Sequence, residues 1–485
     1  MTERLARTLV FVANAAVLMM EILAGRLLAP VVGVTLETFT AIIGVVLAGI
    51  SFGAWIGGVL ADRHDAHKML PLAFVLGGAT AIGSAPMIRF LAGAGWGAGA
   101  QSTIVLAAIG FFAPAALLSS APPMVVKLRL ASVANTGAVV GSLSAIGTAG
   151  SLFGVFITGF VLIGEVAVTP ILIGIGGAMV AIGLLLGARL RTTRRDHLAA
   201  ATSIAIVASA LAISAPNPCQ VETTYFCARV SVDSLLPTGR LLTLDDQRHS
   251  YVDLADPRNL MFSYARIVGD VIDLVAPSAT AIDVVHVGGG GFTLAGYIGA
   301  TRANSTNTVL ELDEGLVSIA EQRLGLVLDA DTTVRIGDAR VQIRSLPDSS
   351  ADFVIGDAFG GRAVPWHLTT VEFLDSVKAV MRPDAVYAVN LIDGSRMAFV
   401  RAETATLRAR FTFVAVIAPP QRIARAIGGN VVIIASDAEL PLDDLRSASA
   451  LHGNTVVSET AELDAFVGGA SVLTDEYAPV DQLLG

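Results

Sequence analysis

The chain has 485 residues, of which 54% are hydrophobic and only 15% charged, a balance too apolar for an ordinary soluble protein. Seven acids and twelve lysines and arginines precede Pro216, which leaves 41 − 7 = 34 acids and 32 − 12 = 20 bases after it. A net charge of about +5 before Pro216 and about −14 after it argues against nucleic acid as a partner. It predicts a membrane domain followed by an acidic soluble domain.

Apolar segments fill the first part of the chain, each near the ~20 residues that an α-helix needs to cross a bilayer. They span residues 8–29, 38–60, 69–91, 102–123, 136–163, 168–188 and 198–215. The first follows Arg4 and Arg7 as a signal peptide would, but its length and Glu21 favour a retained helix. We therefore expect a multi-pass α-helical membrane domain of about seven helices over residues 1–215, with the lipid bilayer as its partner.

Two charged residues, Glu21 and Arg26, lie inside the first predicted helix. An ionisable residue within a membrane is a functional hypothesis by default. A structural pairing of the two, with each other or with Arg89, explains them equally well. Glycines are dense in the same apolar segments, and small residues favour close helix packing in lipid.

Positive charge predicts the orientation of these helices. Arginines and lysines precede the first helix and follow the second, fourth and sixth, at Arg4, Arg7, Arg63, Lys68, Lys127, Arg129, Arg189, Arg191, Arg194 and Arg195. The positive-inside rule then places the N-terminus in the cytoplasm. After seven crossings, the soluble domain would lie outside the cytoplasm.

The only cysteines, Cys219 and Cys227, come directly after the seventh segment. Two closely spaced cysteines on the predicted oxidising side favour a disulfide, and two free thiols are the alternative.

From Val221 onward the pattern is that of a soluble protein. Alternating segments at 225–232 and 240–244 predict a β-hairpin, and a helix over about 259–275 follows it. These elements define a hairpin-and-helix region over residues 216–280. Residues 281–485 form a separate α/β domain.

The stretch 281–315 organises this α/β domain. A run of β-forming residues stops at four consecutive glycines, Gly288, Gly289, Gly290 and Gly291. A predicted helix (292–299) and a second apolar run (309–312) follow. Glycines let the backbone pass close to a ligand, and a helix N-terminus favours electronegative groups.

An acid follows the second apolar run about twenty residues after the glycines. Glu311 or Asp313, at the carboxyl end of that strand, is placed to accept hydrogen bonds from ribose hydroxyls. Together with the glycine turn, this acid predicts nucleoside binding. A packed α/β domain without a ligand is the alternative.

The remaining pattern alternates helices and strands and predicts a mostly parallel, Rossmann-like sheet. Helices are expected at 316–324 and 370–381, and strands at 333–336, 353–355, 386–390 and 430–435.

The order of the motifs resembles that of spermidine synthases. The motifs are Val221-Glu222-Thr223-Thr224-Tyr225, the hairpin ending in Leu244-Asp245-Asp246, the glycine turn, Glu311-Leu312-Asp313, Gly337-Asp338-Ala339 and Asp352-Phe353-Val354-Ile355-Gly356-Asp357. The whole chain looks like bacterial proteins that fuse a membrane domain to a spermidine synthase-like domain. Four more stretches look typical of that group: residues 26–30, 249–251, 364–370 and 474–480.

This resemblance implies a fold and an activity. It implies a methyltransferase-type Rossmann-like domain that transfers an aminopropyl group from decarboxylated S-adenosylmethionine to a small cationic amine such as putrescine. The donor, or S-adenosylmethionine itself, would be a co-substrate and not a tightly bound cofactor. A bacterial inner or plasma membrane location is implied, and the protein could form an oligomer or a larger membrane complex. No metal site is expected.

The resemblance also assigns roles to residues. The glycine turn would line the methionine-derived part of the donor, Glu311 would hold the ribose, and Asp338 the adenine amino group. Asp357 would orient and deprotonate the attacking amine. The remaining candidates are Asp313 and Ala339 for the donor, and Tyr225 and His249 for the substrate.

Departures from the family pattern concentrate where the amine would bind. Asp357 is followed by Ala358-Phe359-Gly360-Gly361, so a second acid is missing, and Tyr264 is followed by Ala265-Arg266 where histidine and glutamate are usual. Gly291 stands where the family usually has an aspartate, and residues near Ala295-Gly296 stand where it usually has an Arg-Glu pair. The positions for ribose and adenine match the family better than those for amine groups.

We therefore expect a membrane-anchored enzyme of the aminopropyltransferase type. The alternatives are another S-adenosylmethionine-dependent transferase, a non-catalytic extracytoplasmic domain that binds a ligand or partner, and a transport role for the membrane half.

Overall fold

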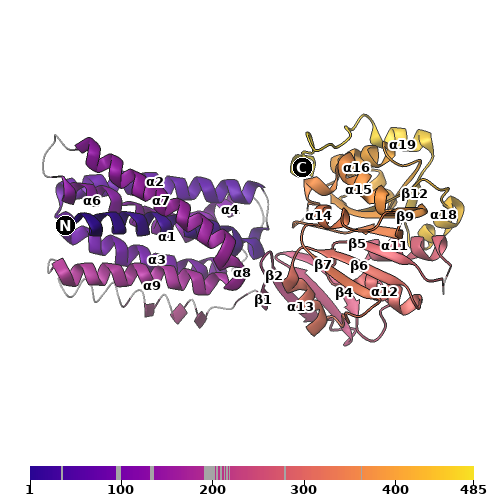
Figure 1. Ribbon diagram of the computed structural model, residues 1–485, viewed down its shortest axis with the longest axis horizontal. Coiled ribbons are helices and arrows are strands. Elements are labelled where there is room, and N and C mark those ends of the chain that lie inside the picture. Colours follow the sequence, from indigo (N-terminus) through magenta and orange to yellow (C-terminus); the bar gives the residue numbers. More distant parts are fainter. Residues whose placement is uncertain are drawn as a thin grey trace. The chain divides into compact units, whose positions relative to one another are not determined.

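A computed structural model gives the structure of the chain. It describes all residues except 34–35, 94–99, 131–135, 191–202, 204–205, 208–209, 212, 215–216, 218, 278–279, 362 and 485. Two compact units make up the chain (Figure 1): Met1–Cys227, here called the helical unit, and Ala228–Gly485, here called the α/β unit.

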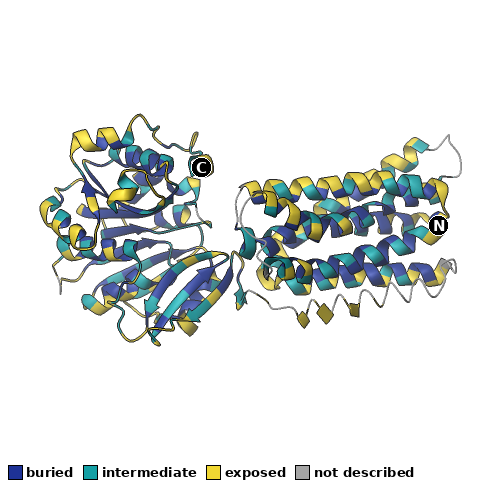
Figure 2. Ribbon diagram, turned by 180° about the vertical axis from the view of Figure 1, so that it is seen from behind, coloured by how far each residue is buried: buried dark blue, intermediate teal, exposed yellow. Residues whose placement is uncertain are grey.

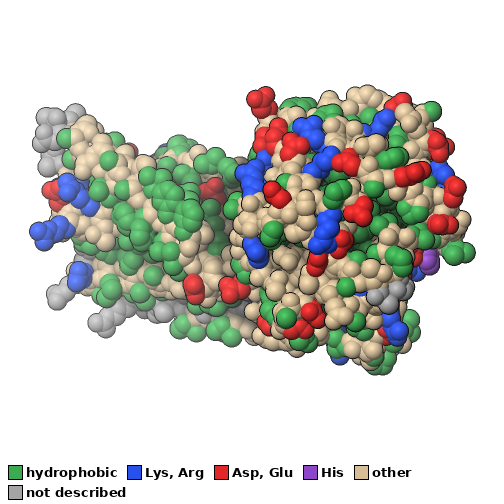
Figure 3. All heavy atoms as spheres, turned by 45° about the vertical axis from the view of Figure 1, so that its right-hand side comes forward, with side chains coloured by type: hydrophobic (Ala, Val, Ile, Leu, Met, Phe, Trp, Pro, Cys, Tyr) green, Lys and Arg blue, Asp and Glu red, His purple; other side chains and the backbone are tan. Residues whose placement is uncertain are grey.

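Six helices among the described residues are long and apolar enough to cross a membrane: Glu3–Val32, Glu37–Arg63, Ala66–Ala92, Gln101–Arg129, Thr136–Glu165 and Val168–Arg189. They correspond to the first six predicted segments. The seventh, 198–215, falls largely outside the described ranges, so it stays a prediction together with the sidedness that depends on it. Apolar side chains dominate the visible face of the helical unit, whereas charged ones are frequent on the α/β unit (Figure 3).

The helical unit contains short π-helical turns within two of its spans. Its elements are α1 (Glu3–Val32), α2 (Leu36–Arg63), α3 (Ala66–Gly93), α4 (Ala100–Ala107), η1 (Ala108–Phe112), α5 (Ala113–Ser119), α6 (Ala121–Arg129), α7 (Thr136–Ile157), η3 (Thr158–Leu162), α8 (Ile163–Glu165) and α9 (Val168–Leu190).

Glycines bring these helices into close contact, as their density in the sequence predicted. A Cβ atom at Gly150 of α7 would lie 2.2 Å from a backbone oxygen of α1, and one at Gly53 of α2 would lie 2.1 Å from a backbone oxygen of α5. A Cβ at Gly78 of α3 would lie 2.3 Å from a backbone oxygen of α9. Any larger residue at these positions would force the helices apart.

Charged side chains of the helical unit hold the segment that follows its helices. The Arg26 guanidinium donates to the carbonyl oxygens of Thr223 (2.5 Å) and Thr224 (2.9 Å). Glu222 accepts a hydrogen bond from the backbone N–H of Val168 (2.7 Å), where α9 begins. These bonds explain why the helical unit extends beyond residue 215, where the sequence placed the end of the membrane domain, and they assign a structural role to Arg26.

The same segment contains the predicted disulfide. Cys219 and Cys227 are bonded to each other, with their Cα atoms 5.0 Å apart. The prediction of a pair, and not of two free thiols, is confirmed.

A small antiparallel sheet begins at this disulfide. Its strands run in the order β1-β2-β3-β4 and comprise β1 (Val221–Glu222), β2 (Cys227–Val232), β3 (Gly239–Leu244) and β4 (Gln247–Asp253). The predicted hairpin corresponds to β2 and β3. The sequence analysis did not identify β4, which follows a tight turn in which Asp245 has a φ of +53°.

The main sheet of the α/β unit has the order β12-β10-β11-β9-β8-β5-β6-β7. Its five strands from β9 to β7 are parallel, whereas β11 pairs with β9, β10 with β11 and β12 with β10 in antiparallel fashion. This confirms the predicted Rossmann-like, mostly parallel sheet. The strands are β5 (Asp283–Val287), β6 (Thr306–Glu311), β7 (Thr332–Ile336), β8 (Ala351–Gly356), β9 (Met381–Asp393), β10 (Phe413–Ala418), β11 (Gly429–Ser436) and β12 (Thr455–Val457).

Helices cover both faces of this sheet, and the buried core lies between the layers (Figure 2). Apolar residues of α11 (Ser263–Val275), α12 (Thr293–Thr301) and α18 (Leu442–Leu451) pack on one face. Those of α14 (Ala339–Ile343), α15 (Val371–Val380), α16 (Ala398–Arg408) and α19 (Thr460–Val467) pack on the other. The remaining short elements are α13 (Glu314–Arg323), η4 (Trp366–Leu368), α17 (Pro420–Ile423) and α20 (Val480–Leu483).

Candidate active site

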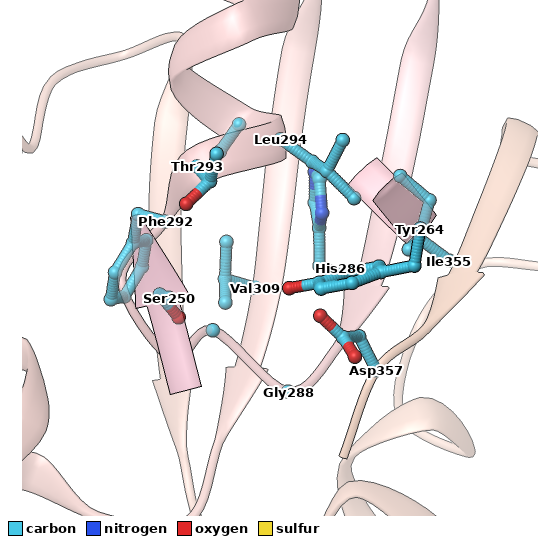
Figure 4. A pocket seen from close by; sticks show the side chains of 12 residues that line it. Ser250, Tyr264, His286, Gly288, Phe292, Thr293, Leu294, Val309, Ile355 and Asp357 are labelled. Atoms are coloured by element: carbon cyan, nitrogen blue, oxygen red, sulfur yellow. The ribbon is translucent and has the colours of Figure 1, made fainter. Parts of the chain in front are cut away.

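A pocket lies where the direction of the chain through the main sheet reverses. From β5 the chain continues to β6 and β7 on one side, and then returns to β8 on the other side of β5. In open α/β sheets, ligands bind at the carboxyl ends of the strands at such a switch point. The pocket, drawn in Figure 4, has a volume of about 20 Å³ and is lined by Ser250, Tyr264, His286, Gly288, Gly289, Phe292, Thr293, Leu294, Ala295, Val309, Ile355 and Asp357.

The glycine turn forms one wall of this pocket and requires glycine at two positions. Gly288 has a φ of +97° and Gly290 a φ of +51°, a region that other residues rarely adopt. A Cβ at Gly288 would also lie 2.6 Å from the carbonyl oxygen of Asp357. The turn therefore passes close to the loop that follows β8, as the sequence predicted for a backbone approaching a ligand.

Glu311 holds the glycine turn in place. Its carboxylate accepts hydrogen bonds from the backbone N–H groups of Gly289 (2.8 Å), Gly290 (3.3 Å) and Asp313 (2.9 Å). Burial raises the pKa of Glu311, and the three N–H groups oppose this effect. A carboxylate offers about four acceptor positions, so three N–H groups leave about one for a ligand hydroxyl.

The other predicted donor residues follow the ends of β6 and β7. Asp313 accepts from the N–H of Gly315 (2.9 Å) and caps α13. Gly337 donates its backbone N–H to the carbonyl oxygen of Glu311 (2.9 Å), which places the residues after it beside the glycine turn. Asp338 and Ala339 thus belong to the same edge of the sheet as Glu311.

Asp338 has a partner that the sequence did not predict. One of its oxygens caps α14 by accepting from the N–H of Arg340 (2.8 Å), and the other lies 2.9 Å from Nε2 of His367. Arg340 in turn forms an ion pair with Asp475, which also accepts from the hydroxyl of Thr370 (2.8 Å). These bonds join the stretches 364–370 and 474–480, which were notable in the sequence, at the donor end of the site.

Asp357 lines the pocket beside the glycine turn, directly after β8. The backbone N–H of Asp357 donates to the carbonyl oxygen of Val287 (2.9 Å), which ties it to the end of β5. Its side chain accepts from Nδ2 of Asn390 (2.9 Å) and from the hydroxyl of Tyr264, which points at the carboxylate in Figure 4. Burial raises the pKa of Asp357 to about 6, although both hydrogen bonds act to lower it.

This environment makes Asp357 a suitable general base. A base works best when its pKa lies near the working pH, and the usual pKa of an aspartate is 3.8. Above pH 6 the carboxylate is ionised, oriented by two donors and able to accept a proton.

Amide side chains continue from Asp357 across the neighbouring strands. Asn390, buried within β9, accepts at Oδ1 a hydrogen bond from Nδ2 of Asn430 (3.1 Å), which lies on β11. Arg422 of α17 donates from Nη1 to the carbonyl oxygen of Asn430 (2.6 Å). The sequence analysis did not single out these three residues, although a buried asparagine in the apolar strand β9 was a signal that could have identified Asn390.

Two histidines near the pocket are neutral. Burial lowers the pKa of His286 and that of His249 to about 4 each. Nε2 of His286 lies 2.9 Å from Oδ1 of Asn307, so it carries the proton. His249 of β4 packs against the glycine turn, since a Cβ at Gly290 would lie 2.8 Å from its ring. It supports the turn beside the pocket instead of lining it.

Tyr225 belongs to the helical unit, is 43% exposed and is not among the residues that line the pocket, so its role at the site stays a prediction. Tyr264, which the sequence analysis identified only as the remainder of a family motif, lines the pocket. Within the described ranges, no group of three or more His, Cys, Asp or Glu residues could hold a metal ion.

Comparisons with known proteins concern the C-terminal half of the chain. The chain is 30% identical over 251 residues to a polyamine aminopropyltransferase of Vibrio vulnificus, which covers 49% of this chain and 80% of the relative. No protein-family model matches the chain. Among solved structures, a probable spermidine synthase from Corynebacterium glutamicum is 27% identical with a TM-score of 0.49, covering 53% of this chain and 95% of that one. Spermidine synthase from Thermotoga maritima is 16% identical with a TM-score of 0.36, covering 53% and 80%.

Proposed function

The chain belongs to the polyamine aminopropyltransferase family, and we propose that its α/β unit transfers an aminopropyl group from decarboxylated S-adenosylmethionine to an amine. The observation that carries the proposal is the environment of Asp357. A carboxylate with a pKa of about 6, oriented by Asn390 and Tyr264, lies beside the glycine turn in one pocket.

The residues divide into two groups, which we name by their proposed roles. The donor side comprises Gly288–Gly291, Glu311 and Asp338, which share the edge formed by β5, β6 and β7. Glu311 has about one acceptor position left for a ribose hydroxyl. Leu312 and Ile336, 44% and 42% exposed, lie at the ends of neighbouring strands and offer an apolar surface to a base.

The acceptor side comprises Asp357, Asn390 and Asn430, together with Arg422. The attacking amine forms a bond to the aminopropyl carbon as the bond from that carbon to sulfur breaks. The electron pair of the broken bond stays on sulfur and converts the sulfonium into the neutral thioether of methylthioadenosine. The amine proton passes to Asp357, whose carboxylate also attracts the cationic donor.

The test is the reaction itself, in full-length protein purified in detergent. With decarboxylated S-adenosylmethionine and a panel of amines, we expect the wild type to release methylthioadenosine and to form an aminopropylated product. Asp357→Asn should lower the rate by about 10²- to 10⁴-fold, because it keeps the shape but removes the base. Asp384→Asn, a change at an exposed aspartate of β9, is the matched control. Equal rates for wild type and Asp357→Asn would contradict the proposal.

We propose further that the helical unit anchors this activity in a bacterial membrane, with the α/β unit outside the cytoplasm. The support is the alternation of positive charge along the six apolar helices, together with the Cys219–Cys227 disulfide. A C-terminal alkaline phosphatase fusion should be active and a green fluorescent protein fusion dark. The opposite pattern would show that the seventh predicted segment does not cross.

A further inference from the structure

The acceptor side carries a positive charge that has no acidic partner. Arg422 forms no ion pair in the described part of the chain, and its Nε is buried without a hydrogen-bond partner. Its guanidinium lies against Gly429, where a Cβ would come within 2.7 Å of Cζ. Two other arginines of the α/β unit, Arg302 and Arg382, form ion pairs with carboxylates.

A continuous set of hydrogen bonds connects Arg422 to Asp357. It runs from Asp357 to Asn390 (2.9 Å), from Asn390 to Asn430 (3.1 Å) and from the carbonyl of Asn430 to Arg422 (2.6 Å). Asn390 and Asn430 lie on neighbouring strands, and β8 is the next strand along. Because adjacent strands are ~4.8 Å apart, Asp357 at the end of β8 and Asn430 on β11 are separated by about two strand spacings, and the guanidinium lies beyond Asn430.

Two buried carboxylates of the α/β unit, Asp393 and Glu403, are unsuited to hold a second ammonium group. Asp393, whose backbone pairs with Gly429, is buried and accepts from the N–H groups of Gly394 (2.7 Å) and Val400 (2.9 Å). Glu403 of α16 is buried, and burial raises its pKa well above the usual value, which favours its neutral form. After Asp357, the chain continues with Ala358, Phe359 and Gly360.

From this arrangement we infer that the acceptor carries an anionic group, such as a carboxylate, opposite its reacting amine. Asp357 takes the amine and the Arg422 guanidinium takes the anion. A diamine would instead place its second ammonium near an unpaired guanidinium, where two like charges repel in a partly desolvated site. An arginine also matches the planar geometry of a carboxylate with paired N–H groups.

The inference rests on the proposed transfer to an amine, and it names the class of acceptor. The matched probes are γ-aminobutyrate and putrescine, which have chains of equal length and differ only in having a carboxylate or a second amine. A second pair, ε-aminocaproate and hexamethylenediamine, tests a longer acceptor in the same way. Each is titrated calorimetrically into full-length protein saturated with methylthioadenosine, which fills the donor side but leaves the position of the aminopropyl group open.

We expect the wild type to bind one of the amino acids at least ~10-fold more tightly than its matched diamine. Arg422→Gln should lower that affinity about 10- to 150-fold, as expected for the loss of a charge-assisted hydrogen bond. Arg422→Lys should keep the preference because it keeps the charge, and Arg422→Glu should reverse it. Arg425→Gln, an exposed arginine in the same loop, is the control and should stay within about two-fold of the wild type.

Tighter binding of the diamines by the wild type, equal binding of the amino acids by Arg422→Gln, or no binding of any probe would overturn the inference. A transfer assay separates this failure from that of the proposed function. If putrescine is aminopropylated and Arg422 does not matter, the proposed function stands and the inference fails. If the amino acids bind through Arg422 but no protein releases methylthioadenosine from decarboxylated S-adenosylmethionine, the recognition stands and the proposed function fails.

Discussion

The donor side and the acceptor side of the α/β unit are built from different kinds of interaction. On the donor side, the carboxylates of Glu311 and Asp338 accept hydrogen bonds mainly from backbone N–H groups, and Asp338 also pairs with His367. On the acceptor side, Asp357 is held by side chains, Asn390 and Tyr264. The backbone N–H groups of a turn or a helix end are present whatever the side chains are, whereas a side-chain donor is lost when its single residue is substituted. Substitutions can therefore change the acceptor without disturbing the donor side.

The largest effect that tests this difference between the two sides is expected from removing the hydroxyl of Tyr264. Its hydrogen bond lowers the pKa of Asp357, so Tyr264→Phe should raise that pKa further above 6. Wild-type activity should fall as the pH drops through about 6, where the base becomes protonated. In Tyr264→Phe the fall should begin at higher pH by about one unit, which lowers the rate about 5-fold at pH 6 and about 10-fold at pH 5 and below.

The pH profile of kcat/KM for methylthioadenosine release measures this shift, and donor affinity should change little. An unchanged profile would mean that Asp357 is not the titrating base. A large loss of donor affinity would mean that the two sides are not separable.

A smaller effect should appear in thermal stability. The pKa of Asp357 is higher in the folded chain, about 6, than its usual 3.8, so ionisation costs stability. That cost is absent below pH 3.8, grows as the pH rises through 6 and is complete above it. Asp357→Asn removes it, so the Tm difference between variant and wild type should rise by a few degrees from pH 4 to pH 7.5.

Asp357→Asn also weakens the hydrogen bond to Tyr264, and this changes the Tm by the same amount at every pH. Differential scanning calorimetry of both full-length proteins across this range gives the result. A Tm difference that falls with increasing pH would contradict the raised pKa.

The smallest effect sharpens the account of the donor side. His367 occupies one oxygen of Asp338, the residue proposed to hold the adenine amino group. His367→Ala frees that oxygen, so methylthioadenosine should bind about 2- to 10-fold more tightly. His452→Ala, at an exposed histidine that ends α18, should have no effect. Weaker binding in His367→Ala would show that the histidine itself contacts the nucleoside.

The sequence predicted the elements whose signals are local. Six apolar segments, the glycine turn and the acids after β6, β7 and β8 follow directly from period, length and spacing, and the structure has each of them. Cys219 and Cys227 were paired correctly because they are only eight positions apart in the sequence. The strand β4 was missed because a left-handed Asp245 makes the preceding turn without the glycine or proline that would mark it.

The acceptor side was harder to predict because its residues meet through the order of the strands. Asn390 and Asn430 are forty residues apart in sequence and become neighbours because β11 inserts antiparallel beside β9. Arg422 lies in the four-residue helix α17, which has no recognisable motif. Tyr225 was chosen from its place in a motif, and its role stays a prediction because it belongs to the helical unit.

The division into two sides is tested most directly by the affinity of methylthioadenosine for wild type, Glu311→Gln and Arg422→Gln, measured by calorimetry on full-length protein. Glu311→Gln should lose about 10- to 150-fold, because it removes the charge that holds both the turn and a ribose hydroxyl. Arg422→Gln should bind within about two-fold of the wild type, since the guanidinium belongs to the other side. Equal losses in the two variants, or no binding to well-folded wild type, would contradict the account.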